Sequence, residues 1–399
     1  MSSQMSLPAR SPVRTAAFYV WAILLYALVS ATVGEVLVRL LVEPAVVPGP
    51  SRIIRTIDPF TANPYVVRMQ PYLHLHVPGS IYYQSRAGYR VRYEINSRGF
   101  RGPEARPRAE SGRRRLLVVG DSMVEGQGVE FGRTFSALLD REFRQQGWEV
   151  MNAGVQAASP LYYAANLERY LALDPDAVLV VLYENDLGDD RVLEQRFDEL
   201  PYLASPPDVL GPSWIDELQA SHLFAFVLGA WSRWDGPPLE PLVTRNRRRL
   251  EPLEQDEEQR AYREVAYYLI APSVFDDHWL TSQRYLDSVL SALQRRGIDV
   301  MVSYLSVLAL DRDASPEFRV HSALLDDRLA RWADRHALAY MSLVPTIADL
   351  YRSRDPATVA IPMDGHLTDE SHAAVAEALQ PWLRQHLGQD GSAGIPSGR

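Results

Sequence analysis

Four short polar segments contain the residues whose types and spacing could do chemistry. They are Gly120-Asp121-Ser122, Asn152-Ala153-Gly154, Tyr183-Glu184-Asn185-Asp186 and Asp364-Gly365-His366. Short apolar runs end in the first three segments, and the fourth precedes the last amphipathic stretch of the chain. Together they supply a hydroxyl, a glycine, an amide and an aspartate–histidine pair. Acyl transfer by a serine nucleophile needs these groups.

Each group has a specific expected role in that chemistry. Ser122 is the candidate nucleophile, His366 could take its proton, and Asp364 could hold the imidazole in the required tautomer. The backbone N–H groups of Ser122 and Gly154 and the side-chain amide of Asn185 could donate to the oxyanion of a tetrahedral intermediate. We therefore expect the catalytic residues Ser122, His366 and Asp364, an oxyanion hole of Ser122, Gly154 and Asn185, and no cofactor or metal.

A second aspartate–histidine pair, Asp369 with His372, competes for the same role. The Leu-Thr that follows His366 fits the start of a helix, with Thr368 as its N-cap. In that case His372 would lie one turn inside the helix. We therefore prefer His366 as the base.

The apolar runs alternate with helical patterns from residue 115 onward. Predicted strands lie at 116–119, 150–153, 177–183, 298–304 and 338–343, and the clearest helices at 279–296, 318–336 and 372–386. A continuous apolar run such as 177–183 is typical of a strand covered on both faces of a parallel sheet. The pattern predicts a doubly wound α/β domain, in which ligands gather at the carboxyl ends of the strands.

The N-terminal region has the features of a membrane anchor. No residue from 15 to 34 is charged, and about 20 apolar residues match a hydrocarbon core ~30 Å thick. Arg10 and Arg14 precede the run, which favours a cytoplasmic N-terminus at 1–14. We expect a transmembrane anchor at 15–38 in the inner or cytoplasmic membrane, single-pass, with the catalytic domain extracytoplasmic. The alternative is a protein secreted after signal cleavage.

The remaining chain divides by composition. Residues 44–112 are rich in proline, include an alternating strand pattern at 89–95, and are expected to form an accessory extracytoplasmic segment. The main domain is expected at 113–388, with an insertion at about 190–270 where prolines interrupt the pattern. The Gly/Ser-rich tail at 389–399 is expected to be disordered.

Composition excludes several classes of protein. The 399 residues contain no cysteine, which excludes a disulfide scaffold, a thiol nucleophile and iron–sulfur clusters. All 41 basic residues are arginine, so Schiff-base lysine chemistry is excluded as well. The formal net charge of −9 argues against nucleic acid as a partner.

The four polar segments, in this order, resemble the signature blocks of the SGNH (GDSL-type) hydrolase superfamily. The segment Asn-Ser-Arg-Gly-Phe-Arg-Gly at 96–102 is similar to one that precedes this domain in membrane-anchored bacterial members. The resemblance covers roughly 113–388 and implies a three-layer α/β/α sandwich with a flavodoxin-like parallel sheet. It also implies the nucleophile, base, orienting carboxylate and oxyanion donors named above.

Two blocks depart from the family pattern. Tyr183 stands where the third block usually has glycine, although Asn185 is in place. One residue separates Asp364 from His366, where the family usually has two. The shorter spacing resembles that of some bacterial polysaccharide O-acetyltransferases of the superfamily.

Three hypotheses follow for the function. The first is a serine esterase that hydrolyses acyl or acetyl esters of cell-envelope glycan or lipid through an acyl-enzyme on Ser122. The second is an O-acyltransferase that passes the acyl group to an exported polysaccharide with the same triad. The third is a non-catalytic glycan-binding or assembly module of the cell envelope. The expected partners are therefore an ester-bearing small molecule, lipid or glycan, and a membrane.

Overall fold

The structure is a computed structural model of the whole chain. It describes residues 12–42, 66–69, 72–76, 78–86, 89–196, 218, 220–233, 272–311, 314, 316–362 and 364–388. The predicted disordered tail at 389–399 and most of the predicted insertion lie outside the described residues.

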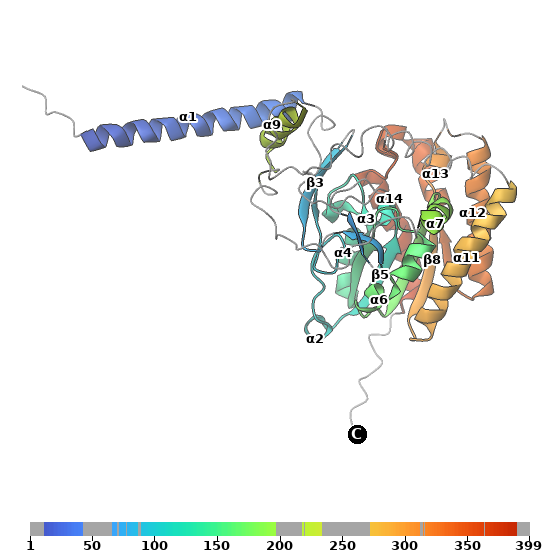
Figure 1. The fold of residues 1–399 in the computed structure, drawn as a ribbon. Helices are drawn as coiled ribbons and strands as arrows, with labels where there is room; N and C mark the ends of the chain where they lie inside the picture. Colours follow the sequence, from blue (N-terminus) through green and yellow to red (C-terminus); the bar gives the residue numbers. More distant parts are fainter. Residues whose placement is uncertain are drawn as a thin grey trace, which may run out of the picture.

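The core of the molecule is a five-stranded parallel sheet in the order β6-β5-β7-β8-β9 (Figure 1). Its strands are β5 (Arg114–Gly120), β6 (Trp148–Gly154), β7 (Ala177–Tyr183), β8 (Asp299–Leu305) and β9 (Ala339–Ser342). The chain turns to one side after β5 and to the other side from β7 onward. A topological switch point therefore lies between β5 and β7, where open α/β sheets bind their ligands.

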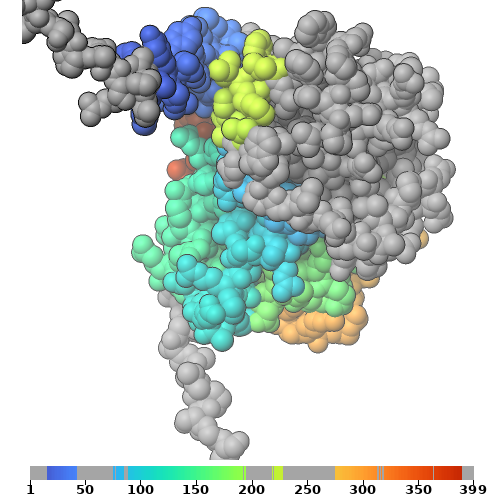
Figure 2. Space-filling model, turned by 60° about the vertical axis from the view of Figure 1, so that its left-hand side comes forward, coloured from blue at the N-terminus to red at the C-terminus, as the bar shows by residue number. Residues whose placement is uncertain are grey.

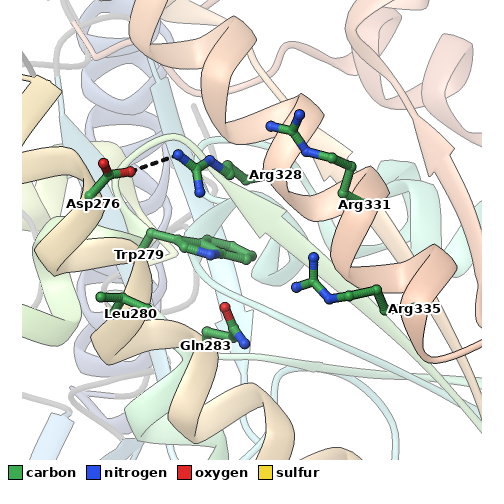
Figure 3. A pocket seen from close by; sticks show the side chains of 7 residues that line it. All are labelled: Asp276, Trp279, Leu280, Gln283, Arg328, Arg331 and Arg335. Atoms are coloured by element: carbon green, nitrogen blue, oxygen red, sulfur yellow. Dashed lines mark hydrogen bonds and ion pairs between the residues drawn. The ribbon is translucent and has the colours of Figure 1, made fainter.

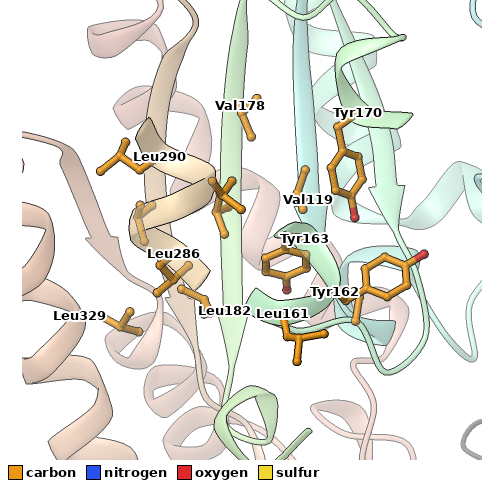
Figure 4. Close-up of a cluster of buried hydrophobic side chains, with 14 of the residues drawn as sticks. Val119, Leu161, Tyr162, Tyr163, Tyr170, Val178, Leu182, Leu286, Leu290 and Leu329 are labelled. Carbon is orange, nitrogen blue, oxygen red and sulfur yellow. The ribbon is translucent and has the colours of Figure 1, made fainter. Parts of the chain in front are cut away.

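Side chains alternate between the two faces of the sheet because successive strand residues point in opposite directions. Val119 and Leu182 face the cluster that packs under α5 (Pro160–Ala165), α6 (Leu167–Leu171), α11 (Pro272–Gln294) and α12 (Pro316–Arg335) (Figure 4). Val118 and Val181 face the opposite cluster, under α4 (Phe135–Phe143), α13 (Val344–Ser353) and α14 (Asp369–His386). Helices thus cover both faces, and the three-layer α/β/α sandwich is confirmed.

The strands of the sheet agree with the predictions to within a few residues, because the apolar runs of β5, β6, β7 and β8 are largely buried. β7 (Ala177–Tyr183) begins and ends at the predicted residues. The ten-residue helix α13 (Val344–Ser353) was not predicted, since its amphipathic pattern is short and begins beside Pro345. The helix α7 (Asp186–Arg196) also continues into the region predicted as an irregular insertion.

An accessory segment precedes the sheet. It contains two antiparallel pairs, β1 (Val66–Met69) with β2 (Tyr72–His76) and β3 (Ile81–Arg86) with β4 (Tyr89–Glu94). The predicted strand at 89–95 corresponds to β4. The turns at 95–102 then lead through the short helix α2 (Arg108–Ser111) into β5.

The N-terminal helix α1 (Pro12–Leu41) projects away from the sandwich (Figure 1). The part at 16–41 is long and apolar enough to span a membrane, a property that a signal sequence near an N-terminus shares. Its apolar side chains face outward, and Trp21 is 72% exposed. An exposed apolar surface of this length needs a membrane or another apolar partner to cover it.

The polar end of α1 contacts α9 (His222–Arg233), a helix within the predicted insertion (Figure 2). Glu35 accepts hydrogen bonds from the backbone N–H of His222 at 3.0 Å and of Leu223 at 2.9 Å. The Ser221 hydroxyl donates to the same carboxylate at 2.7 Å. Glu35 therefore satisfies N–H groups at the start of α9 that have no partner within that helix.

Candidate active site

The candidate nucleophile lies at the carboxyl end of β5, beside the switch point. Asp121 follows the strand and caps the short helix α3 (Ser122–Glu125), since its carboxylate accepts a hydrogen bond from Met123 N at 2.8 Å. Burial raises the pKa of Asp121 to about 6, against the lowering effects of the Met123 N–H and of His366. Ser122 is 7% exposed.

Ser122, His366 and Asp364 lie in one chain of hydrogen bonds. The Nε2 atom of His366 is 2.7 Å from Ser122 Oγ. The other ring nitrogen, Nδ1, contacts Asp364 Oδ1. The Asp364 side chain is 3% exposed and that of His366 16%. This arrangement can move a proton from the hydroxyl to the imidazole while the carboxylate stabilises the imidazolium.

A tight loop presents His366. The backbone N–H of Ile361 donates to the His366 carbonyl at 2.8 Å, and Gly365 has a φ of +86°, a conformation that glycine adopts without strain. Thr368 caps α14 by accepting a hydrogen bond from Ser371 N at 3.3 Å. The predicted N-cap is therefore confirmed, and it fixes the point at which the loop becomes helix.

The competing pair, Asp369 with His372, is in a different environment. Asp369 forms an ion pair with Arg133 at 2.5 Å on the surface. The ring of His372 is buried inside α14, stacks on Phe135, and accepts a hydrogen bond from Phe135 N at 3.2 Å. The two side chains thus have separate partners, and neither is in the hydrogen-bond chain of Ser122.

The expected oxyanion donors at the next two strand ends have partners within the protein. Gly154 N donates to Asn152 Oδ1 at 2.9 Å, and Asn185 Nδ2 donates to Asp189 Oδ2 at 2.8 Å. The glycine at 154 is required sterically, because a Cβ atom there would lie 2.2 Å from the backbone nitrogen of Glu125. Strand β6 therefore approaches the helix that carries Ser122 very closely.

Two further side chains contact the hydrogen-bond chain and were not predicted. The Gln127 amide nitrogen is 3.3 Å from His366 Nδ1, and the Tyr89 hydroxyl donates to Asp364 Oδ2 at 3.4 Å. Gln127 follows the nucleophile by five residues, whereas Tyr89 belongs to the accessory strand β4. The short distance along the sequence between Gln127 and Ser122 could have indicated that Gln127 belongs to the site. Nothing in the sequence indicated that Tyr89 does.

Buried carboxyl groups lie directly after β7, one of the two strands at the switch point. Burial raises the pKa of Glu184 to about 7, and it raises that of Asp186 well above its ordinary value. Glu184 accepts hydrogen bonds from Val307 N at 2.7 Å and Ala309 N at 3.1 Å, so it joins the ends of two neighbouring strands. Asp186 accepts a hydrogen bond from Tyr183 N at 3.3 Å, so both carboxyls brace the end of β7.

One cavity of the structure is lined by other side chains than those of this hydrogen-bond chain. Among the residues that the structure describes, no group of three or more His, Asp or Glu side chains is arranged to hold a metal ion. A cavity of about 360 Å³ lies between α11 and α12 (Figure 3). It is lined by Asp276, Trp279, Leu280, Gln283, Arg328, Arg331 and Arg335. The cavity therefore has no side chain in common with Ser122, His366 and Asp364.

No family model and no curated protein matches the sequence. Solved structures do match. LAE5, an alpha/beta hydrolase enzyme from the metagenome of Lake Arreo, is 15% identical, with 67% of this chain and 93% of that chain covered and a TM-score of 0.38. A catalytic mutant of Axe2, an acetylxylan esterase from Geobacillus stearothermophilus, is 12% identical, with 68% and 93% covered and a TM-score of 0.39.

A protein of the G-D-S-L family from Desulfitobacterium hafniense is 10% identical, with 66% and 98% covered and a TM-score of 0.34. Likeness at this level carries no argument about activity. The strand order and the three layers, by contrast, are direct observations. The fold is the one that the resemblance to SGNH hydrolases implies.

Proposed function

We propose that this protein is a serine esterase of the cell envelope that acts on acyl or acetyl esters of glycan or lipid. The observation that carries the proposal is the hydrogen-bond chain from Ser122 through His366 to Asp364, with 2.7 Å between the hydroxyl and the imidazole. Three groups from two distant parts of the sequence meet there in the order that nucleophilic catalysis needs.

In the first half of the reaction, Ser122 Oγ attacks the ester carbonyl carbon while its proton passes to His366 Nε2. The tetrahedral intermediate collapses as the carbon–oxygen bond to the alcohol breaks, and the imidazolium returns the proton to the leaving alcohol oxygen. Asp364, on Nδ1, stabilises the imidazolium. The product is an acyl-enzyme on Ser122 and a free alcohol.

In the second half, His366 takes a proton from water, and the resulting hydroxide attacks the acyl carbon. Collapse of this second intermediate breaks the bond to Ser122 Oγ, which regains its proton from the imidazolium and releases the free acid. The enzyme returns to its starting state without any added reagent.

The backbone N–H groups of Ser122 and Gly154 and the amide of Asn185 remain the proposed oxyanion donors. Two of these groups already donate to other side chains, so their hydrogen bonds must change before they can bind an oxyanion. The Gly154 N–H must leave Asn152 Oδ1 and donate to the oxyanion instead. The Asn185 amide must direct an N–H to the oxyanion rather than to Asp189. Catalytic hydrogen bonds of this kind often tighten only when the substrate is bound.

The proposed location follows from α1. Its apolar surface is exposed, and Arg10 and Arg14 precede the uncharged run at 15–34, which supports a single membrane span with the N-terminus in the cytoplasm. In this arrangement the accessory segment at 44–112 and the hydrolase domain at 113–388 are extracytoplasmic. The active site would then work on esters of the envelope outside the cytoplasmic membrane.

The test is hydrolysis of p-nitrophenyl acetate and p-nitrophenyl butyrate by the full chain in detergent. We expect turnover with release of free acid, and a loss of at least ~10³-fold in kcat for Ser122→Ala. Ser353→Ala is the matched control, because Ser353 lies on the exposed surface of α13 and bonds to its own helix. It should keep wild-type activity.

Two results would contradict the proposal. If Ser122→Ala keeps its turnover, Ser122 is not the nucleophile. If the acyl group passes to an added glycan acceptor in preference to water, the enzyme is an acyltransferase rather than an esterase.

A further inference from the structure

The accessory segment reaches the active site through the turn at 96–102. The Asn96 side chain shapes this turn, because its Oδ1 atom accepts hydrogen bonds from Arg98 N at 3.0 Å and Phe100 N at 3.1 Å. Gly99 has a φ of +77°, which glycine tolerates. Phe100 is buried in the core under the sheet, and the next residue, Arg101, is directed inward and is 1% exposed.

The Arg101 guanidinium binds the backbone of the turn that follows the nucleophile. Its Nη1 atom donates to Gly126 O at 2.5 Å and to Glu125 O at 3.2 Å, and its Nη2 atom donates to Val129 O at 2.7 Å. The guanidinium carbon also lies 3.8 Å from the centroid of the Tyr93 ring. A planar group with donors in a fixed fork therefore sets the positions of three carbonyls at once.

This turn carries Gln127 and is hydrogen-bonded to the backbone of Ser122. Its backbone folds back on the nucleophile, since Gly126 N and Gln127 N both donate to Ser122 O at 3.0 Å. The Gln127 side chain then contacts His366 Nδ1 at 3.3 Å. A displacement of the turn would therefore move Gln127 and Ser122 relative to the imidazole.

A second buried contact joins the accessory segment to the same turn. His76 Nε2, on β2, is 3.1 Å from Glu125 Oε2, and both side chains are almost fully buried. Burial acts to raise the pKa of Glu125, but the facing His76 and the Arg101 guanidinium lower it below its ordinary value. Glu125 is therefore held as a carboxylate, which also accepts a hydrogen bond from Gln156 N at 2.5 Å.

We propose that Arg101 is a positioning residue for the ester hydrolysis, and that the accessory segment is an integral part of the active site. Arg101 holds the turn at 125–129 so that Ser122 and Gln127 meet His366. This inference rests on the proposed function.

The test compares Arg101→Lys and Arg101→Met with wild type. Lysine keeps the charge but not the planar fork, and methionine keeps volume without either. We expect kcat on p-nitrophenyl acetate to fall ~10–100-fold in both variants, because small misplacements of reacting groups have effects of this size. KM should stay within ~3-fold, since the substrate contacts are retained. Arg98→Met, an exposed side chain of the same turn, is the control and should match wild type.

A merely structural role would give a different result. If the variants are folded by near-ultraviolet circular dichroism at the assay temperature and their kcat equals that of wild type, the inference is wrong. A double-mutant cycle sharpens this, because effects of Arg101→Lys and Gln127→Ala on kcat should be non-additive if Arg101 acts through the turn. Additive effects would contradict it.

Two further outcomes are distinguishable. If neither Arg101 variant folds, the kcat of Gly126→Ala tests the inference instead. A Cβ atom at residue 126 would clash with Thr134 and disturb the turn, while the Arg101 side chain is retained. An unchanged kcat in Gly126→Ala would overturn the inference. If wild type shows no ester hydrolysis and no reaction of Ser122 with a fluorophosphonate, the proposed function fails and the inference fails with it.

Discussion

The two aspartate–histidine pairs near the start of α14 share a sequence neighbourhood but differ in every physical respect. His366 lies in the loop before the helix, with one ring nitrogen on Ser122 and the other on Asp364. His372 lies inside the helix, where one nitrogen accepts a backbone N–H and the ring stacks on Phe135. Access to a hydroxyl and a carboxylate on opposite sides of the ring, rather than spacing in the sequence, distinguishes a candidate base from a structural histidine.

The largest expected effect is that of His366→Ala. Without the imidazole, Ser122 has no base to take its proton, so kcat on a short acyl ester should fall by at least ~10³-fold. Steady-state kinetics measure this, with His386→Ala as the control because His386 is exposed near the end of α14. A His366→Ala enzyme with near-normal kcat would remove the distinction between the two pairs.

Asp364→Asn tests the orienting role of the carboxylate. An amide in this place can hold the wrong tautomer and cannot stabilise the imidazolium, so we expect kcat to fall ~10²–10⁴-fold with little change in KM. The melting temperature of the variant serves as the control for folding. Wild-type kcat in a folded variant would show that Asp364 is dispensable.

His372→Phe should affect stability instead of catalysis. Phenylalanine keeps the ring against Phe135 but leaves Phe135 N without its acceptor, so unfolding should become easier by ~1–3 kcal/mol at neutral pH. Urea denaturation measures this free energy. We expect kcat within ~3-fold of wild type below the unfolding transition. A loss as large as that of His366→Ala would mean that the base was assigned to the wrong pair.

The same residue predicts a pH dependence of stability. Burial, with smaller contributions from Arg101 and His366, lowers the pKa of His372 from 6.5 to about 3. His372 therefore becomes protonated below pH 6.5 in the unfolded chain but stays neutral in the folded chain. The free energy of unfolding accordingly decreases as the pH falls. Relative to His372→Phe, the free energy of unfolding of wild type should decrease by ~1.4 kcal/mol per pH unit as the pH falls from 6.5 towards 3.

Urea denaturation of both proteins between pH 7 and pH 4 checks this sign, because the comparison cancels groups common to both. Asp121, Glu184 and Asp190, whose pKa values burial raises, would shift stability in the opposite direction in both proteins. A difference that is independent of pH would show that His372 is not held neutral by burial.

Asp369→Asn should have the smallest effect. Its ion pair with Arg133 is solvent-exposed, and exposed pairs contribute little, so we expect a change in unfolding free energy within ~0.5 kcal/mol and unchanged kcat. A large loss of activity in this variant would revive the Asp369–His372 pair as the catalytic one.

The fold could be predicted from the sequence because most of its strands are short apolar runs that are largely buried. β7 is the clearest of these strands. Thr368 was also predicted correctly as the N-cap of α14, because its residue type and its place before a helical pattern are typical of a cap. The polar residues at the strand ends could be placed on one edge of the sheet for the same reason. Helix α13 was not predicted, because its amphipathic pattern spans only ten residues and begins beside a proline.

The partners of the site residues could not be predicted in the same way. That Gly154 N–H meets Asn152, or that Asn185 meets Asp189, depends on side-chain orientation at the end of a strand. The contacts of Arg101 and of His76 with the nucleophile turn depend on how a separate segment packs against the sheet. Such contacts between distant segments leave no periodic signal in a single sequence.

The most direct test of the account is the reaction of the full chain with a fluorophosphonate, followed by peptide mapping. We predict one adduct, on Ser122, that forms at the wild-type rate in His372→Phe and at least ~10³-fold more slowly in His366→Ala. No adduct on Ser122, or equal labelling of Ser122 in His366→Ala and wild type, would contradict a serine nucleophile activated by His366.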